Sequence, residues 1–161
     1  MLYVGHRGEH KNFQVLSEAF RLPVLDDFDL VAVGGQPVMP AAPSLHHLAN
    51  VPDSGLRCAY AGAAAFVFPS LCEGFGLPLL EAMSCGAPIA ASDIPTNREV
   101  AGAAFIPFDP ADPRSCAESI LQAAGPARAR LLTAARDRLP RFSWTDCAAR
   151  TLRVYRQVLN T

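Results

Sequence analysis

The sequence predicts one α/β domain in which a parallel sheet of about six strands is covered by helices on both faces. Two observations lead to this fold class. Short, unbroken apolar runs alternate with segments of helical periodicity from end to end, and that alternation is typical of parallel sheets buried on both sides. The length of 161 residues suits one domain with a sizeable core. We therefore expect residues 1–161 to form a single domain.

The first part of the chain predicts two strands with a helix between them. Residues 2–5 form the first apolar run, and Asn12 can cap a helix whose apolar residues recur at helical spacing. The second strand spans 28–33 and ends at a pair of glycines. The proline-rich stretch 36–43 predicts a loop.

The middle of the chain is less regular. The stretch 44–50 is ambiguous by pattern alone. Asp53 is placed to cap a helix with an apolar face. A strand at 65–68 and a helix at 77–85 follow, and Gly86 ends that helix.

The last part of the chain predicts two more strands and four helices. The strands are expected at 88–91 and 104–107, and between them Thr96 and Glu99 have the spacing of a capping box that opens a helix. Three helices complete the chain. Their predicted spans are 112–124, 126–138 and 144–159, opened by Asp112 with Pro113, by Pro126, and by a second capping box of Ser143 and Asp146.

Alternating strands and helices of this kind predict a Rossmann-like, doubly wound sheet, in which ligands bind at the carboxyl ends of the strands. The loop at 6–11 follows the first strand, and the loop after Phe68 follows a later one. Both loops leave the sheet at the same edge. We therefore expect Lys11 and Glu73, which these loops carry, to lie close together.

Composition and charge exclude several classes of protein. Half of the residues are hydrophobic and the net charge is −1, which favours a folded globular protein and gives no case for nucleic-acid binding. No apolar run approaches the ~20 residues that a membrane span needs. The five cysteines are scattered, which is typical of reduced thiols in a cytoplasmic protein. The histidines have no partner at metal-ligand spacing, so we expect no metal site.

The stretch from Phe68 to Glu81 carries the strongest functional signal. It reads Phe-Pro-Ser-Leu-Cys-Glu-Gly-Phe-Gly-Leu-Pro-Leu-Leu-Glu and places Glu73 and Glu81 eight residues apart, around a glycine-containing turn that leads into a helix. Gly74 and Gly76 allow unusual backbone dihedrals and a close approach to a ligand. Pro78 suits the first helical position.

The same stretch predicts how a ligand is bound. The N–H groups near Gly76 and Leu77 are free to face an anion, with the helix dipole behind them. Carboxylates only accept hydrogen bonds, which suits pairs of sugar hydroxyls. A phosphate flanked by hydroxyls is the outline of a nucleotide-sugar. Two solvated surface glutamates are the plainer interpretation, and a dinucleotide fingerprint is weak because Leu79 stands where its third glycine belongs.

The stretch resembles the Glu-x7-Glu motif of retaining, family 4-type glycosyltransferases with the GT-B fold. Residues 86–93 resemble the strand after the motif helix of that family, 98–102 the next helix and turn, and 3–12 its donor-phosphate loop. The resemblance covers nearly the whole chain but only the donor-binding half of the family's fold. It implies that the N-terminal acceptor domain is absent, and it favours a short strand at 44–50.

The resemblance also implies roles for individual residues. Lys11 binds the donor diphosphate, Glu73 the hydroxyls of the transferred sugar, and Glu81 the ribose. Arg7 assists at the phosphate, although His6 occupies the usual place of the family's arginine and is the alternative. The remaining residues expected at the donor site are Gly5, Val51 by the base, Gly74, Phe75, Gly76 and Leu77.

These assignments imply retaining transfer of a hexose from a nucleoside diphosphate sugar to a saccharide or lipid-linked acceptor, in the synthesis of a cell-surface polysaccharide or lipopolysaccharide. The alternative is a nucleotide-sugar binding module or truncated fragment without transferase activity of its own. We expect no cofactor and no metal. We expect a cytoplasmic chain with at most peripheral membrane contact, which needs an acceptor-domain partner or self-associates. In the family the helix at 144–159 crosses back to the acceptor domain, so its apolar side is expected to be exposed here.

Overall fold

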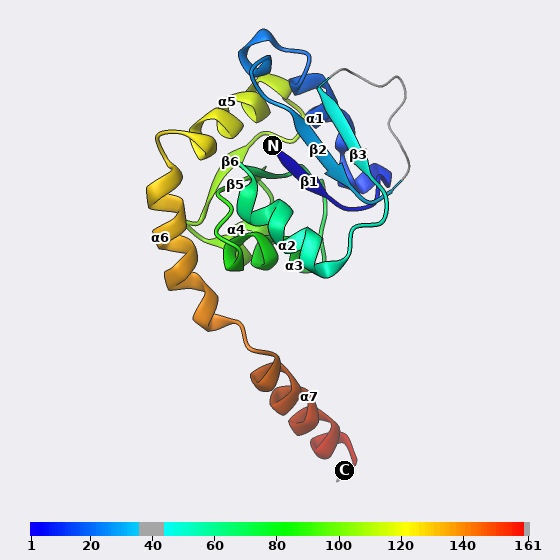
Figure 1. The fold of residues 1–161 in the computed structure, drawn as a ribbon. Coiled ribbons are helices and arrows are strands. Elements are labelled where there is room, and N and C mark those ends of the chain that lie inside the picture. The colour runs from blue at the N-terminus through cyan, green and yellow to red at the C-terminus, as the bar shows by residue number, and fades with distance from the viewer. Residues whose placement is uncertain (36–43, 160–161) are drawn as a thin grey trace.

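The computed structural model describes residues 1–35 and 44–159, so the predicted loop at 36–43 lies outside the described residues. The described chain forms a six-stranded, entirely parallel sheet with helices on both faces (Figure 1). The predicted fold class is confirmed. The strands are β1 (Leu2–Val4), β2 (Leu30–Val33), β3 (Leu45–Leu48), β4 (Phe66–Phe68), β5 (Ile89–Ser92) and β6 (Phe105–Phe108).

Seven α-helices and three short 3₁₀ turns accompany these strands in the described part of the chain. The α-helices are α1 (Phe13–Ala19), α2 (Asp53–Gly62), α3 (Leu77–Ser84), α4 (Pro95–Ala101), α5 (Pro113–Ala124), α6 (Arg128–Arg138) and α7 (Trp144–Leu159). The 3₁₀ turns are η1 (Glu9–Lys11), η2 (Pro23–Leu25) and η3 (Leu139–Arg141). The sequence patterns did not indicate the three 3₁₀ turns.

The strand order across the sheet is β3-β2-β1-β4-β5-β6. The chain therefore winds outward in one direction from β1 through β2 to β3, and in the other direction from β4 to β6. The order reverses between β1 and β4, which pair through Leu2 and Phe66. In doubly wound sheets, the loops that leave the carboxyl ends of the strands at such a reversal diverge to opposite faces and leave a crevice for a ligand.

Side chains alternate between the two faces of the sheet and build a core on each. Tyr3 and Val67 belong to the first core cluster, which α1 and α5 cover. Leu2 and Phe66 belong to the second cluster, which α2, α3 and α4 cover. Helix α6 contributes to both clusters and so lies along the edge of the body of the domain, as Figure 1 shows.

Two of the predicted helix caps are wrong. Asn12 precedes α1 but has a left-handed backbone (φ 49°) and makes no side-chain cap. Its Nδ2 instead donates to the carbonyl oxygen of Pro110 at 2.8 Å, across 98 residues of sequence. Asp53 is the first residue of α2, and Pro52 holds the cap position. Helix α1 therefore starts where the sequence predicted but without the side-chain cap, whereas α2 starts one residue earlier than a cap at Asp53 would place it.

Other boundary predictions are confirmed or shifted by one or two residues. Asp112 caps α5 by accepting from the N–H of Arg114, and Ser143 Oγ accepts from the N–H of Asp146 at the start of α7. The ambiguous stretch 44–50 contains a strand, β3. Strand β2 begins two residues later than predicted, because the N–H of Phe28 is bonded to Leu25 O in the turn after η2.

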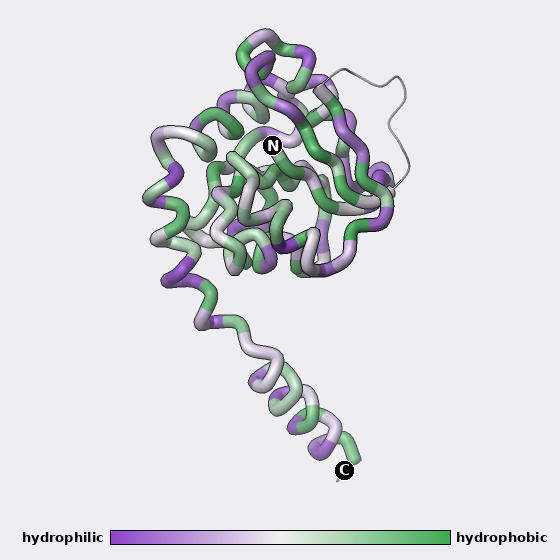
Figure 2. The backbone as a smooth tube through the Cα atoms, viewed as in Figure 1, coloured by the Kyte–Doolittle hydropathy of each residue, from purple (hydrophilic) through white to green (hydrophobic). Residues whose placement is uncertain are grey.

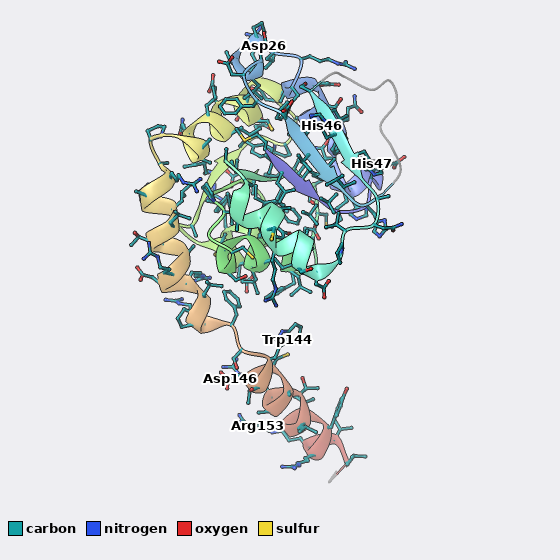
Figure 3. The ribbon with its side chains drawn as sticks, in the orientation of Figure 1. Asp26, His46, His47, Trp144, Asp146 and Arg153 are labelled. Atoms are coloured by element: carbon teal, nitrogen blue, oxygen red, sulfur yellow. The ribbon has the colours of Figure 1, made fainter. Side chains whose placement is uncertain are left out.

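Helix α7 projects away from the body of the domain (Figures 1 and 3). All sixteen of its residues are exposed, and Trp144 has 77% of its surface accessible. Hydrophobic and hydrophilic residues alternate along its turns (Figure 2). Its large apolar side chains are Trp144, Leu152, Val154, Tyr155, Val158 and Leu159. The expected exposure of the apolar side of this helix is confirmed.

The same substitution in α6 and in α7 should have very different effects on stability. Leu131 is 1% exposed and packs in the first core cluster, whereas Leu152 is 52% exposed. We expect Leu131→Ala to lower the free energy of unfolding by about 2–5 kcal/mol. Leu152→Ala should change it by less than about 0.5 kcal/mol. Urea denaturation of both variants measures the difference. Comparable losses would contradict the exposed position of α7.

Candidate functional site

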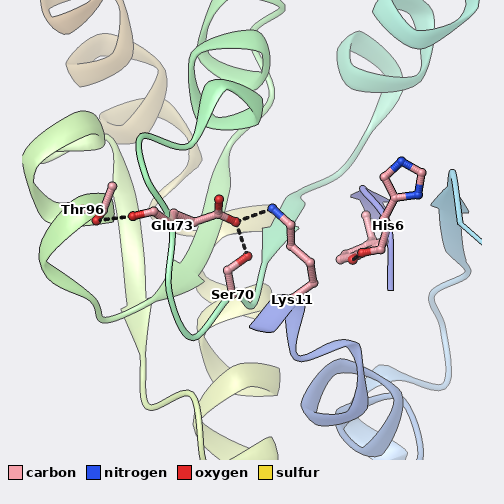
Figure 4. A network of polar contacts seen from close by, with 6 residues as sticks. His6, Lys11, Ser70, Glu73 and Thr96 are labelled. Carbon is pink, nitrogen blue, oxygen red and sulfur yellow. Dashed lines mark hydrogen bonds and ion pairs between the residues drawn. The ribbon is translucent and has the colours of Figure 1, made fainter. Parts of the chain in front are cut away.

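An ion pair joins two loops at the reversal of strand order. Lys11 lies in η1, after β1, and Glu73 lies in the turn between β4 and α3. Lys11 Nζ and Glu73 Oε1 are 2.6 Å apart, and both side chains are largely shielded, with 20% and 11% of their surfaces exposed (Figure 4). The expected proximity of these two residues is confirmed. Its cause is the parallel sheet, which brings the carboxyl ends of β1 and β4 together.

Further hydrogen bonds hold the two loops in register. The N–H of Leu71 donates to His10 O at 2.8 Å, which joins the loop before Glu73 to the turn that carries Lys11. Ser70 is buried, and its Oγ donates to Glu73 Oε1 at 2.6 Å. Oε1 of Glu73 thus accepts from both Lys11 and Ser70. Oε2 has no hydrogen-bond partner among the described residues and is the oxygen left for a ligand.

Thr96 supports the same turn from α4, which corrects the predicted capping box. Helix α4 begins at Pro95 with Ile94 in the cap position and has no side-chain cap. Thr96 is therefore already inside the helix, as its second residue and two positions past the cap. Its Oγ1 donates instead to the main-chain oxygen of Glu73 at 3.0 Å (Figure 4).

Arg7 is a half-buried cation whose guanidinium makes no hydrogen bond to the described residues. All three guanidinium nitrogens are shielded from solvent and unpaired among the described residues, and the guanidinium lies 4.8 Å from the centre of the Phe13 ring. Burial lowers the pKa of Arg7 from its ordinary value. Burial also raises the pKa of Tyr3 to about 12, an increase that the nearby Arg7 opposes and the nearby Glu73 supports.

A buried, unpaired charge is costly, and an anion bound beside Arg7 would offset that cost. The alternative residue, His6, is exposed, and its carbonyl oxygen accepts a hydrogen bond from the Tyr3 hydroxyl at 2.8 Å. Its imidazole ring points away from the Lys11–Glu73 pair in Figure 4. The geometry therefore favours Arg7 over His6 as the second cation of the site.

The start of α3 lies next to Glu73. Gly76 has φ 87°, and a Cβ there would come within 3.2 Å of Leu79 Cδ1, so the position requires glycine. Gly74 does not have a positive φ, but the space around it is open. The N–H groups of Gly76 and Leu77 have no backbone partner among the described residues, as expected at the first turn of a helix. Pro78 is the second helical residue, one later than predicted.

Glu81 belongs to a separate group of side chains. Its Oε2 accepts a hydrogen bond from the Tyr60 hydroxyl at 2.9 Å, which ties α3 to α2. Burial, together with the negative charge of Glu81, raises the pKa of Tyr60 well above its usual range. An open pocket of about 650 Å³ lies here. Its lining residues are Asp53, Leu56, Arg57, Tyr60, Glu81, Ser84 and Cys85.

The other predicted site residues lie around these two groups. Val51 precedes α2 and packs against the second core cluster. The N–H of Gly5 donates to Val33 O at 3.0 Å at the end of β1. Phe75 is 44% exposed, and its ring meets that of Phe142 edge to face at 5.9 Å between ring centres. Within the described residues, no three His, Cys, Asp or Glu side chains are grouped closely enough to hold a metal ion.

Sequence reasoning missed three supporting residues. Ser70 lies inside the motif, and its closeness to Glu73 in the sequence was only a weak indication that the two side chains bond. Tyr60 had the helical spacing of a core residue, and its hydroxyl contact with Glu81 depends on how α2 packs against α3. Thr96 matched a capping box, which concealed its contact with the turn.

The arrangement can bind a ligand that carries both negative charge and hydroxyl groups. Two cations and the first turn of α3 follow β1 and β4 at the carboxyl edge of the sheet, and arginine, lysine and free N–H groups are the usual binders of phosphate. The two carboxylates supply acceptors for hydroxyls. In the residues that the structure describes, no helix is both long enough and apolar enough to span a bilayer.

Comparisons with known proteins agree with this chemistry. A family model described as "Glycosyl transferases group 1" matches residues 1–125. O-antigen chain mannosyltransferase B of Escherichia coli is 40% identical over 114 residues, which are 70% of this chain and 30% of that protein. O-antigen chain mannosyltransferase RfbU of Salmonella typhimurium is 38% identical over 73 residues, or 45% of this chain and 21% of that protein. The chain thus spans less than a third of the length of these relatives.

Solved structures agree on the fold. Sucrose-phosphate synthase from Thermosynechococcus elongatus matches 99% of this chain and 45% of its own, with a TM-score of 0.82 and 26% identity. TarM matches 96% of this chain and 34% of its own, with a TM-score of 0.79 and 16% identity, which supports the fold alone. The family match covers most of the described domain and includes both loops that meet at Lys11 and Glu73. The chain therefore belongs to the group 1 glycosyltransferases.

Proposed function

We propose that this domain binds a nucleoside diphosphate sugar and forms the donor half of a retaining hexosyltransferase. In the complete enzyme the acceptor is a saccharide or a lipid-linked saccharide, used at the cytoplasmic face of the membrane in the synthesis of a cell-surface polysaccharide. Mannose is the first choice of sugar, because relatives that share 38–40% identity are named mannosyltransferases.

The observation that carries this proposal is the Lys11–Glu73 ion pair at the reversal of strand order, beside the unpaired guanidinium of Arg7. Each member of the pair suits a different part of the donor. When a nucleotide-sugar enters, Lys11 turns to the diphosphate, and Glu73 accepts from hydroxyls of the sugar. Lys11 then exchanges the carboxylate for phosphate oxygens, and Glu73 exchanges the ammonium group for hydroxyl donors. Neither charged group is left without a hydrogen-bond partner.

The chemistry of transfer follows from the same groups. Departure of the diphosphate builds negative charge on the leaving oxygen, and preorganised cations and N–H groups stabilise that charge. Lys11, Arg7 and the first N–H groups of α3 supply these donors in place of a divalent metal. Glu81 binds the ribose, oriented by the Tyr60 hydroxyl that already holds it at 2.9 Å. Val51 lies by the base.

The isolated chain should bind nucleoside diphosphates without a metal ion, and Lys11 should carry much of the affinity. We expect Lys11→Met to weaken binding roughly 10- to 150-fold, which corresponds to a charge-assisted hydrogen bond of about 1.5–3 kcal/mol. Calorimetric titration with GDP, UDP and dTDP, with and without EDTA, measures this. Arg21→Met is the matched control, because Arg21 is exposed and lies in the turn after α1.

Chemical labelling gives a second measurement. Lys11 is the only lysine in the sequence, so a bound nucleotide should slow its acylation while the N-terminal amine serves as an internal reference. Strict dependence on Mg²⁺, or no binding of any nucleotide at millimolar concentration, would count against the proposal.

The two glutamates should separate in their effects. Glu81→Gln should weaken binding of the nucleotide and of the nucleotide-sugar alike, because both ligands contain ribose. Glu73→Gln should leave nucleoside diphosphate binding nearly unchanged and remove only the extra affinity that the sugar gives, roughly 10-fold or more. Titration of both variants with GDP and GDP-mannose, and with UDP and UDP-glucose, measures this. Glu118→Gln on the exposed side of α5 is the control. Equal losses for both ligands in Glu73→Gln would overturn the assignment.

The chain alone should show no appreciable sugar transfer. It spans 30% of the E. coli relative, and alignment of an acceptor in a closed cleft can supply roughly 7–11 kcal/mol of the barrier. A donor bound to this domain alone should at best be hydrolysed slowly. The assay supplies the purified chain with the donor that binds and with saccharide and lipid-linked acceptors. Rapid turnover by a verified monomer would mean that the acceptor site lies within these residues, and donor binding without any turnover matches the expectation.

A further inference from the structure

Thr96 makes a contact that its own helix does not require. Its hydroxyl leaves α4 and donates to the main-chain oxygen of Glu73 at 3.0 Å, across 23 residues of sequence (Figure 4). A hydroxyl near the start of a helix typically serves the free N–H groups of that helix. Here α4 starts without a side-chain cap, and the hydroxyl is used on a separate turn of the chain.

The support from which Thr96 reaches the turn is rigid. Its neighbour Asn97 is fully buried, and Asn97 Nδ2 donates to the carbonyl oxygen of Ser92 at 2.9 Å. Arg98 forms a two-fold ion pair with Asp93, in which Nη2 and Oδ2 are 2.6 Å apart. The first turn of α4 is therefore tied to the end of β5 through the two residues that follow Thr96.

The turn that carries Glu73 has few restraints of its own. The space around Gly74 is open, and Phe75 is 44% exposed with an edge-to-face contact to Phe142. The carboxylate of Glu73 is held by Lys11 and Ser70, both through Oε1. Under the proposed function, Lys11 leaves this carboxylate for the diphosphate when the donor binds. One of the two side-chain restraints is then lost when the carboxylate must meet the sugar.

The contact from Thr96 does not depend on the partners of the carboxylate, because it is made to the main chain. It keeps the backbone of Glu73 in place while the side chain exchanges Lys11 for sugar hydroxyls. We infer that Thr96 is a positioning residue that holds Glu73 toward the sugar of a bound nucleotide-sugar. This inference rests on the proposed function, and it assigns the hydroxyl of Thr96 to selection of the sugar-bearing donor over the free nucleotide.

The test compares Thr96→Val with Thr96→Ser. The valine variant keeps the shape but loses the hydroxyl, and the serine variant keeps the hydroxyl. The measured quantity is the ratio of the dissociation constants of nucleotide and nucleotide-sugar, for GDP with GDP-mannose and for UDP with UDP-glucose. We expect Thr96→Val to reduce this ratio by about 2- to 13-fold, the range of one neutral hydrogen bond, with affinity for the free nucleotide unchanged. Thr96→Ser should restore the ratio.

The chain provides matched controls. Thr133 and Thr151 are exposed, and each donates through Oγ1 to a carbonyl oxygen four residues earlier in its own helix. Valine at either position removes the same kind of hydroxyl, remote from the turn, and should leave the ratio unchanged. Hydrogen exchange in the absence of ligand provides a second readout. The amides of Gly74 and Phe75 should exchange faster in Thr96→Val than in Thr96→Ser or in either control.

The outcomes separate this inference from the function on which it rests. An unchanged ratio in Thr96→Val, or an equal loss of affinity for nucleotide and nucleotide-sugar, overturns the role of Thr96. If the unmodified chain binds no nucleotide-sugar, the proposed function fails. Faster exchange confined to the turn in Thr96→Val then still shows that Thr96 holds Glu73, and unchanged exchange would refute that as well.

Discussion

The reversal of strand order between β1 and β4 is the constraint on which the site depends. Because all six strands are parallel, their carboxyl ends share one edge of the sheet, and the loops after β1 and β4 meet there. Lys11 and Glu73 are 62 residues apart in sequence and 2.6 Å apart in space for this reason. The bond from Leu71 to His10 then joins the two loops directly. A different strand order would separate the loop that carries Lys11 from the loop that carries Glu73.

The site also concentrates charge where burial makes charge costly. Arg7 has three shielded nitrogens without a partner among the described residues, and the Lys11–Glu73 pair is mostly shielded as well. Desolvated charges of this kind are weak contributors to folding stability and can oppose it. Their arrangement suits the binding of an anion, because a negatively charged ligand would give the guanidinium of Arg7 the partner that the described residues do not provide. Proteins often retain such strain at functional sites.

The two glutamates of the motif share one stretch of sequence but have different surroundings. Glu73 is held by the turn of Lys11, by Ser70 and by α4, whereas Glu81 is held by Tyr60 of α2. Under the proposed function, this separation would give each end of a nucleotide-sugar its own support. The exposed apolar side of α7 lies outside both groups, and neither buried hydrophobic cluster contains a residue of this helix.

The sequence by itself determined the alternation of strands and helices, the parallel sheet, the motif around Glu73 and the meeting of that motif with Lys11. Periodicity, glycine and proline signals and the topology rule for parallel sheets are enough for these features, because each depends on neighbouring residues or on strand direction alone. Only the tertiary structure decided that Thr96 supports Glu73 instead of capping α4, that Tyr60 holds Glu81, and that the guanidinium of Arg7 is shielded without a hydrogen-bond partner among the described residues. Those contacts join residues that are far apart in the chain. A side chain that fits a local pattern, such as a helix cap, bonds equally well to a distant group once the fold brings that group within reach.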